Sequence, residues 1–231
     1  SFRDGSCRAI CRQKERRALL SFKDDLADPS NSLRSWSAEA AECCRWAGVV
    51  CDNSTRRVVE LRLHGGGNHI ISTRSTTLNP SLLHLRSLSR LDLGGNNFSK
   101  IQIPKFLGSM TGLTFLDLSD SGFRGLIPQE IGNLSGLQHL NLSISYNLEV
   151  KSLGWLSTLP SLESLDLSSV ALRNATQWEE SVSTLHNLME LHLSDCGLLH
   201  ISHVLPSSVN LSSSLRVLNL SKNEFGSHAP S

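Results

Sequence analysis

Residues 113–142 read LTFLDLSDSGFRGLIPQEIGNLSGLQHLNL and contain one pattern twice. The pattern is L-x-x-L-x-L, which begins at Leu113 and again at Leu137. Because alternate residues of a strand point to opposite faces, its second half predicts a short strand that buries two leucines. One such unit cannot bury its own leucines, so the recurrence predicts a stack of units around a continuous apolar core.

The pattern extends along most of the chain. Its second and third apolar positions are Leu in every copy, and successive copies begin 24 to 30 residues apart. They begin at Val58, Leu88, Leu113, Leu137, Leu162, Leu188 and Leu215. This period is typical of leucine-rich repeats. We therefore expect an α/β leucine-rich-repeat solenoid of about seven repeats, with a curved parallel sheet on its concave side.

The segments between the expected strands favour the plant-specific class of these repeats. Ile-Pro occurs in two of them, at Ile103-Pro104 and within Gly125-Leu126-Ile127-Pro128. The Gly-x-Ile-Pro sequence is characteristic of that class. Proline lacks an amide proton and fixes φ, so it suits an edge-like return segment.

One position of the repeat normally holds Asn, three residues after the last Leu, where its amide links successive turns. Here Asn96 and Asn223 occupy it in two repeats. In four others it holds Ser121, Ser145, Val170 and Cys196. Because Cys is an accepted variant at this position, we expect Cys196 to be a buried free thiol rather than a disulfide partner or a nucleophile.

The N-terminal part is expected to be a cap, because the first repeat would otherwise expose its leucines. Apolar residues at helical spacing predict an amphipathic helix from about Gln13 to Ala27, which Asp28-Pro29 ends. We place the cap at residues 1–57 and the solenoid at residues 58–231, without a C-terminal cap.

The cysteines are concentrated in this cap. Five of the six lie in the first 51 residues, namely Cys7, Cys11, Cys43, Cys44 and Cys51. Clustered cysteines in a small terminal unit favour disulfides made in an oxidising compartment. A zinc site is the alternative, but neither paired CxxC motifs nor a His-x3-5-His motif accompanies the cysteines.

Possible glycosylation sites also favour secretion. Five N-x-S/T asparagines lie outside the expected strands, at Asn53, Asn97, Asn133, Asn174 and Asn210. Two more, Asn141 and Asn219, lie on strands, where a glycan would block the concave sheet. Such sites carry glycans only in secreted proteins.

Composition and motifs argue against several functional classes. The net charge of +1 indicates neither nucleic acid nor an anionic membrane as partner. No apolar run approaches the roughly 20 residues of a membrane helix. No hydrolase, metalloprotease, phosphate-loop or dinucleotide motif occurs, so we expect no enzyme and no cofactor. His139 and His192 lie two strands, or roughly 10 Å, apart, which is too far to share a metal.

The outward-facing strand positions of repeats three to six are the candidate binding surface. Six of them are acidic and none is Lys or Arg, whereas residues 1–23 hold seven Lys/Arg and two Asp/Glu. The candidate residues are Phe115, Asp117, Asp120, His139, Glu163, Asp166, Glu190, His192 and Asp195. They are hypothesised to bind a basic or hydroxyl-rich ligand. The alternative is that Asp merely suits this position of the repeat and that the charges are solvated.

Three stretches resemble the N-terminal cap of plant leucine-rich-repeat receptors. They are ERRALLSFK at residues 15–23, Ser35-Trp36, and Cys43-Cys44-x-Trp46-x-Gly48-Val49-x-Cys51. Residues 152–157 (SLGWLS) and 191–198 (LHLSDCGL) most resemble receptor-like proteins of the fungal-xylanase (ethylene-inducing xylanase) receptor type. The resemblance implies the disulfides Cys11–Cys43 and Cys44–Cys51. Cys7 has no counterpart, so it is either a free thiol or a competitor of Cys11.

The resemblance also implies a function. It implies an extracellular recognition module of a plant immune receptor-like protein, at the apoplastic face of the plasma membrane or secreted. The ligand would be a microbial protein or a cell-wall-derived glycan elicitor, and separate co-receptor kinases would signal. The alternative is a soluble inhibitor or decoy of a pathogen's cell-wall-degrading enzyme, like the polygalacturonase-inhibiting proteins. Because the receptors carry more repeats and a membrane helix, the chain is expected to be either a fragment of one or a truncated, secreted form.

Overall fold

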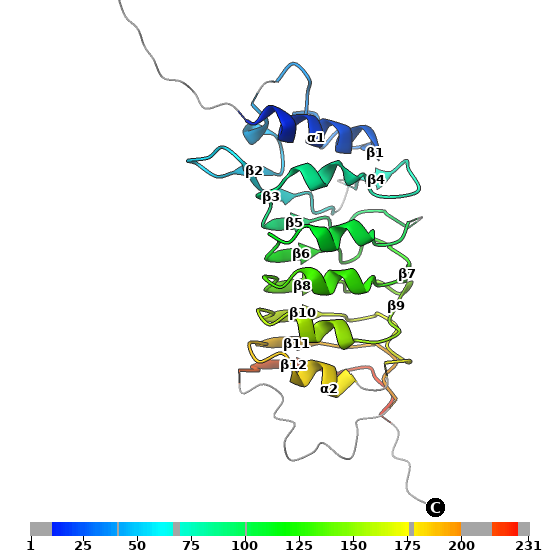
Figure 1. The fold of residues 1–231 in the computed structure, drawn as a ribbon. Helices are drawn as coiled ribbons and strands as arrows, with labels where there is room; N and C mark the ends of the chain where they lie inside the picture. Colours follow the sequence, from blue (N-terminus) through cyan, green and yellow to red (C-terminus); the bar gives the residue numbers. More distant parts are fainter. Residues whose placement is uncertain are drawn as a thin grey trace, which may run out of the picture.

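The chain stacks turn upon turn from an N-terminal helix to a C-terminal strand (Figure 1). The computed structural model describes residues 11–40, 42–66, 70–99, 101–175, 178–199 and 214–225. Cys7 and Asn210 lie outside these residues. Strands line one side of the stack, and short helices cover the other.

The expected strands form one sheet with seven parallel members. They are β3 (Val58–Arg62), β5 (Arg90–Asp92), β6 (Phe115–Asp117), β8 (His139–Asn141), β10 (Ser164–Asp166), β11 (Glu190–His192) and β12 (Val217–Asn219). The middle leucines of successive strands are direct partners, from Leu61 with Leu91 through to Leu191 with Leu218. From Leu61 to Leu191 each of them is fully buried. The leucine-rich-repeat solenoid is therefore confirmed.

An eighth strand, which the sequence pattern did not predict, comes from the cap. Strand β2 (Val49–Cys51) pairs antiparallel with β3, with Val49 opposite Leu61. Gly48 immediately before it has φ +75, and a Cβ there would overlap the carbonyl oxygen of Arg62. Only glycine tolerates both conditions without strain. The cap thus extends the sheet of the repeats. Residue 57 remains our proposed boundary between the cap and the solenoid.

The cap helix α1 spans Gln13–Asp24 and buries Ala18, Leu19 and Phe22. The expected end at Ala27 was wrong. Leu26–Ala27 instead form strand β1, which pairs antiparallel with β4 (Ser72–Thr73). The amide of Arg74 also donates to the carbonyl of Asp25 (2.8 Å), so contacts from a distant loop end the helix early.

On the helical side, five of the return segments contain a short helical turn within the residues that the structure describes. These turns are η2 (Pro80–His84), η3 (Lys105–Ser109), η4 (Gln129–Asn133), η5 (Gly154–Thr158) and α2 (Trp178–Ser183), with η1 (Cys43–Arg45) in the cap. Pro104 and Pro128 precede η3 and η4 as extended N-cap residues, and both lie in return segments, where the Ile-Pro motifs were expected. Strands β7 (Gly125–Leu126) and β9 (Leu148–Glu149) form a small parallel sheet of their own, separate from the main sheet. No helix in the described ranges is long and apolar enough to span a bilayer.

Candidate binding surface on the concave sheet

The outward side chains of the sheet form two straight rows, because the strands are in register. One row runs Asp92, Asp117, Asn141, Asp166, His192 and Asn219. The second runs Arg90, Phe115, His139, Ser164, Glu190 and Val217. Six of the candidate residues of the sequence hypothesis fall in these rows, namely Phe115, Asp117, His139, Asp166, Glu190 and His192. Glu163 directly precedes β10.

The acidic row is largely engaged in local hydrogen bonds. The Oδ1 atom of Asp117 accepts from the amide and hydroxyl of Ser119 (2.9 and 2.6 Å), and Oδ2 accepts from Nδ2 of Asn141 (3.3 Å). Asp166 likewise accepts from the amide of Ser168 (2.8 Å). Asp117 is only 8% exposed. These contacts support the alternative interpretation for this row, because the same carboxylate position repeatedly caps the turn that follows its strand.

The second row presents a more varied surface. The guanidinium carbon of Arg90 lies 3.3 Å from the centroid of the Phe115 ring, a cation–π contact. The rings of Phe115 and His139 are 5.7 Å apart. Farther along, the hydroxyl of Ser164 donates to Oε2 of Glu190 (3.2 Å). The row therefore passes from a cation over aromatic rings to a carboxylate.

Arg90 was missed by the sequence reasoning, which considered only repeats three to six. Its register position in repeat two was the signal that would have found it. Two large exposed hydrophobic residues lie in the turn after β8, Ile144 (49% exposed) and Tyr146 (70% exposed). Such side chains are the type that anchors protein interfaces.

Asp120 and Asp195 do not join either row. Both are exposed and lie in the turns after their strands, with φ of 46 and 57. Ile144 occupies the same turn position with φ 53. Asp tolerates this left-handed conformation better than most residues. The structure therefore places these two carboxylates at the edge of the sheet.

One cluster on the sheet contains metal-ligand types of atoms. Ligand atoms of His64, Asp92 and Asp117 lie within 4.8 Å of one another. Nδ1 of His64 already contacts Oδ1 of Asp92 (3.0 Å), and Nη2 of Arg90 lies 3.7 Å from Oδ2 of Asp92. Because the carboxylates have these partners, the cluster belongs to the polar network of the sheet.

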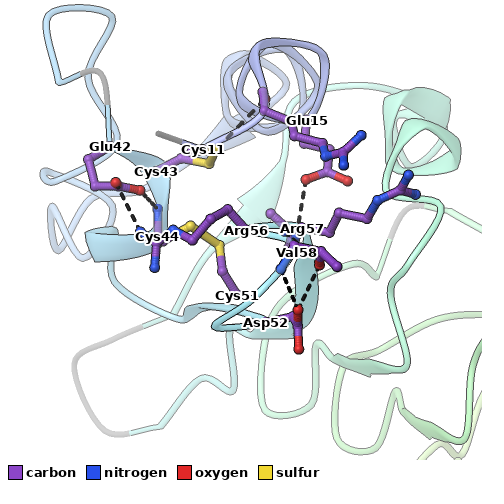
Figure 2. Close-up of a disulfide and its surroundings, with 12 residues drawn as sticks. Cys11, Glu15, Glu42, Cys43, Cys44, Cys51, Asp52, Arg56, Arg57 and Val58 are labelled. Atoms are coloured by element: carbon purple, nitrogen blue, oxygen red, sulfur yellow. Dashed lines mark hydrogen bonds and ion pairs between the residues drawn. A yellow bond between two sulfur atoms is a disulfide. The ribbon is translucent and has the colours of Figure 1, made fainter. Parts of the chain in front are cut away.

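The cap contains both disulfides that the resemblance implied, Cys11–Cys43 and Cys44–Cys51 (Figure 2). They tie the start of α1 to η1, and η1 to β2. Four of the candidate glycan acceptors have exposed side chains, namely Asn53, Asn97, Asn133 and Asn174.

Cys196 is the free cysteine among the described residues, and it is buried. Its Sγ donates to the carbonyl of Leu167 (3.1 Å), so it joins successive repeats as Asn does elsewhere. Burial raises the pKa of this thiol to about 12. The buried free thiol expected from the repeat pattern is thus present.

Cys196 is expected to resist alkylation in the folded protein, because the reactive thiolate is scarce at about pH 8 when the pKa is so high. In urea the same residue should react as an ordinary thiol. Peptide mass mapping after iodoacetamide treatment measures this directly. Equal labelling of Cys196 in the folded and unfolded protein would contradict the structure.

Comparison with known proteins agrees with the fold. Residues 12–52 match the leucine rich repeat N-terminal domain family, and residues 87–110 and 111–172 match leucine rich repeat families. The chain is 42% identical to receptor-like protein EIX1 of Solanum lycopersicum over 98% of its own length and 23% of that protein. It is 40% identical to receptor-like protein EIX2 of the same species, over 94% of its length and 22% of that protein.

The chain thus spans less than a quarter of the length of these two relatives. Among solved structures it is similar to the Arabidopsis receptor kinase HAESA in complex with the peptide hormone IDA and the co-receptor SERK1. The TM-score is 0.65 at 25% identity, covering 92% of this chain and 38% of HAESA. With its in-register repeats, its disulfide-bonded cap and these family matches, the chain belongs to the leucine-rich-repeat proteins, and along nearly its whole length it is similar to plant receptor-like proteins.

Proposed function

We propose that this chain is the extracellular recognition module of a plant immune receptor-like protein. It binds a microbial protein or a cell-wall-derived elicitor through its concave sheet and supports defence signalling through co-receptor kinases. The observation that carries the proposal is the second row of the sheet, in which Arg90, Phe115, His139 and Glu190 stand on rigid strands. The module works by binding, without a catalytic centre or a cofactor.

The proposed contact residues follow from the geometry. Phe115 and His139 offer an aromatic centre, and Arg90 and Glu190 offer opposite charges on either side of it. Interfaces draw most of their affinity from such aromatic and Arg anchors. Glu163, Asp166 and His192 extend the proposed surface. Asp120 and Asp195 border it in the turns after their strands, and the largely buried Asp117 supports it from the first row. HAESA, in complex with a peptide hormone and a co-receptor, is a precedent for the binding of both kinds of partner by a similar fold.

We also propose secretion to the apoplast, with glycans on Asn53, Asn97, Asn133 and Asn174. These four side chains are exposed, and two disulfides stabilise the cap. A glycan on Asn141 or Asn219 would stand in the rows of the sheet, so those sites should stay unmodified if the sheet binds a protein.

Replacing Phe115 with Ala or Glu190 with Lys is expected to weaken binding of a purified secreted fungal xylanase, each by about tenfold, or about 1.4 kcal/mol. Phe115→Ala removes the aromatic centre, and Glu190→Lys reverses the charge at one end of the row. The measurement is biolayer interferometry on the glycosylated, secreted chain at two salt concentrations. Only Glu190→Lys should change the salt dependence.

Glu180→Lys is the matched control, because Glu180 is exposed on helix α2. It makes the same charge change on the helical side, so it should leave binding unaltered. Equal affinity of the wild type and both concave variants would refute the proposed surface. A bound xylanase that loses its hydrolytic activity would instead identify the chain as an inhibitor or decoy.

A further inference from the structure

A cavity of about 650 Å³ lies beside helix α1, away from the concave rows. Five Lys and Arg residues line it, namely Arg12, Lys14, Arg17, Arg57 and Arg86. They come from three places in the sequence: helix α1 and its N-cap, the residue before β3, and the segment after η2. The fold therefore gathers onto one cavity a part of the basic charge of the N-terminal segment.

None of these five cations has an ion pair with a carboxylate within the described ranges of the chain. The acidic residue in the wall is Glu15, which is 4% exposed. Its Oε2 accepts a hydrogen bond from the amide of Val58 (3.0 Å), as Figure 2 shows. That carboxylate faces the start of strand β3 and holds the cap on the first repeat. Arg57 donates to the hydroxyl of Ser87 (3.3 Å), a neutral partner.

Clustered like charges around a concave surface repel one another and create a field that concentrates anions. The volume lies within the range of small-molecule sites, which is about 300–1,000 Å³. Guanidinium groups bind carboxylates and phosphates through two parallel hydrogen bonds, and four of the five cations are Arg. The cavity thus has the size and the charge of a site for a multiply charged anion.

The uncharged residues of the wall indicate which kind of anion would fit the cavity. Ser21 and Ser81 contribute hydroxyl groups, and the hydroxyl of Ser81 donates to the carbonyl of Ala18 (2.9 Å), which leaves its oxygen free to accept from a ligand. Among the described residues of the wall, Ala18 has the only apolar side chain, and it offers no anchor for a hydrophobic peptide residue. Sugar acids match both features: their carboxylates accept hydrogen bonds from guanidinium groups, and their hydroxyls form hydrogen bonds with serine hydroxyls.

We propose that this cavity binds an oligosaccharide of uronic acids. The site is separate from the concave surface, because its residues lie on α1, at the start of β3 and around η2, whereas the proposed contact residues lie on β5 to β11. The chain would therefore hold an acidic polysaccharide at its cap while the sheet remains free for a protein.

The test is isothermal titration of the secreted chain with trigalacturonate, and with galactotriose as the neutral trisaccharide of similar size. Trigalacturonate should bind with one site per chain, more weakly as salt rises, and galactotriose should not bind. Arg17→Gln combined with Arg86→Gln removes one guanidinium from helix α1 and one from the segment after η2. Each change should lower the affinity on the order of tenfold, as the loss of one charge-assisted contact does.

Arg34→Gln combined with Arg124→Gln is the matched control, because both are exposed cations outside the cavity. It removes the same net charge and should leave the titration unchanged. An equal loss in this control, or equally tight binding of an acidic peptide of the same charge, would overturn the proposal. Phe115→Ala should bind trigalacturonate like the wild type, so this test stands apart from that of the concave surface.

Discussion

Replacing Asn96 with Ala is expected to lower the free energy of unfolding by about 3 kcal/mol, because buried polar partners left unpaired cost about 1–3 kcal/mol each. Asn96 is only 6% exposed. Its Nδ2 donates to the carbonyls of Leu63 (2.7 Å), Leu93 (2.9 Å) and Gly94 (3.1 Å), and its Oδ1 accepts from the amide of Ile71 (3.1 Å). One side chain thus links two repeats and the long return segment between them.

Not every partner of Asn96 would be left without a hydrogen bond in the variant. The carbonyl of Leu93 also accepts from the hydroxyl of Ser121 (2.7 Å), so it keeps a partner. The amide of Ile71 and the carbonyl of Leu63 would lose theirs and remain buried. Urea denaturation monitored by circular dichroism measures the change in stability.

Asn223→Ala is the matched control at the same position of a later repeat. Asn223 makes similar bonds, to the carbonyls of Leu193 (2.6 Å) and Leu220 (2.9 Å), but it is half-buried rather than buried. Water can replace its bonds more easily, so the loss should be smaller. A loss at Asn223 as large as that at Asn96 would show that burial does not govern the strength of this link.

Removing the disulfide Cys11–Cys43 by a double change to Ala is expected to destabilise the protein by about 4 kcal/mol. The bond closes a loop with a sequence separation of 32 residues, and longer loops lose more entropy on closure. Both cysteines are buried, and Cys11 lies two residues before helix α1. The cap helix should therefore loosen first, which hydrogen exchange at Ala18 and Leu19 would report.

The matched control is the double Ala change of Cys44 and Cys51, whose separation is 7 residues. Its expected loss is about 2 kcal/mol, because the shorter loop gains less from closure. Both doubles should be made in a Cys7→Ser background, so that a third thiol cannot replace Cys11. Equal losses in the two doubles would contradict the loop-closure explanation.

The sequence alone determined the repeats, because the burial of alternate residues is a local property of each strand. Each middle leucine lies where the L-x-x-L-x-L spacing predicts, and each Ile-Pro lies in a return segment, as expected. Cys196 followed from the same spacing, since its position in the repeat dictates burial. The disulfide pairs came from the resemblance and not from the spacing of the cysteines.

Only the tertiary structure decided which side chains meet across repeats. Helix α1 ends at Asp24 because β1 pairs with β4, a contact between segments about 46 residues apart. Asp117 is buried by its neighbours, and Phe115 meets Arg90, through the register of the stack. The cationic cavity has the same origin, because Arg17, Arg57 and Arg86 lie far apart in the sequence. Local pattern sets which face of each repeat is buried, whereas the pairing of exposed groups depends on how the repeats are stacked.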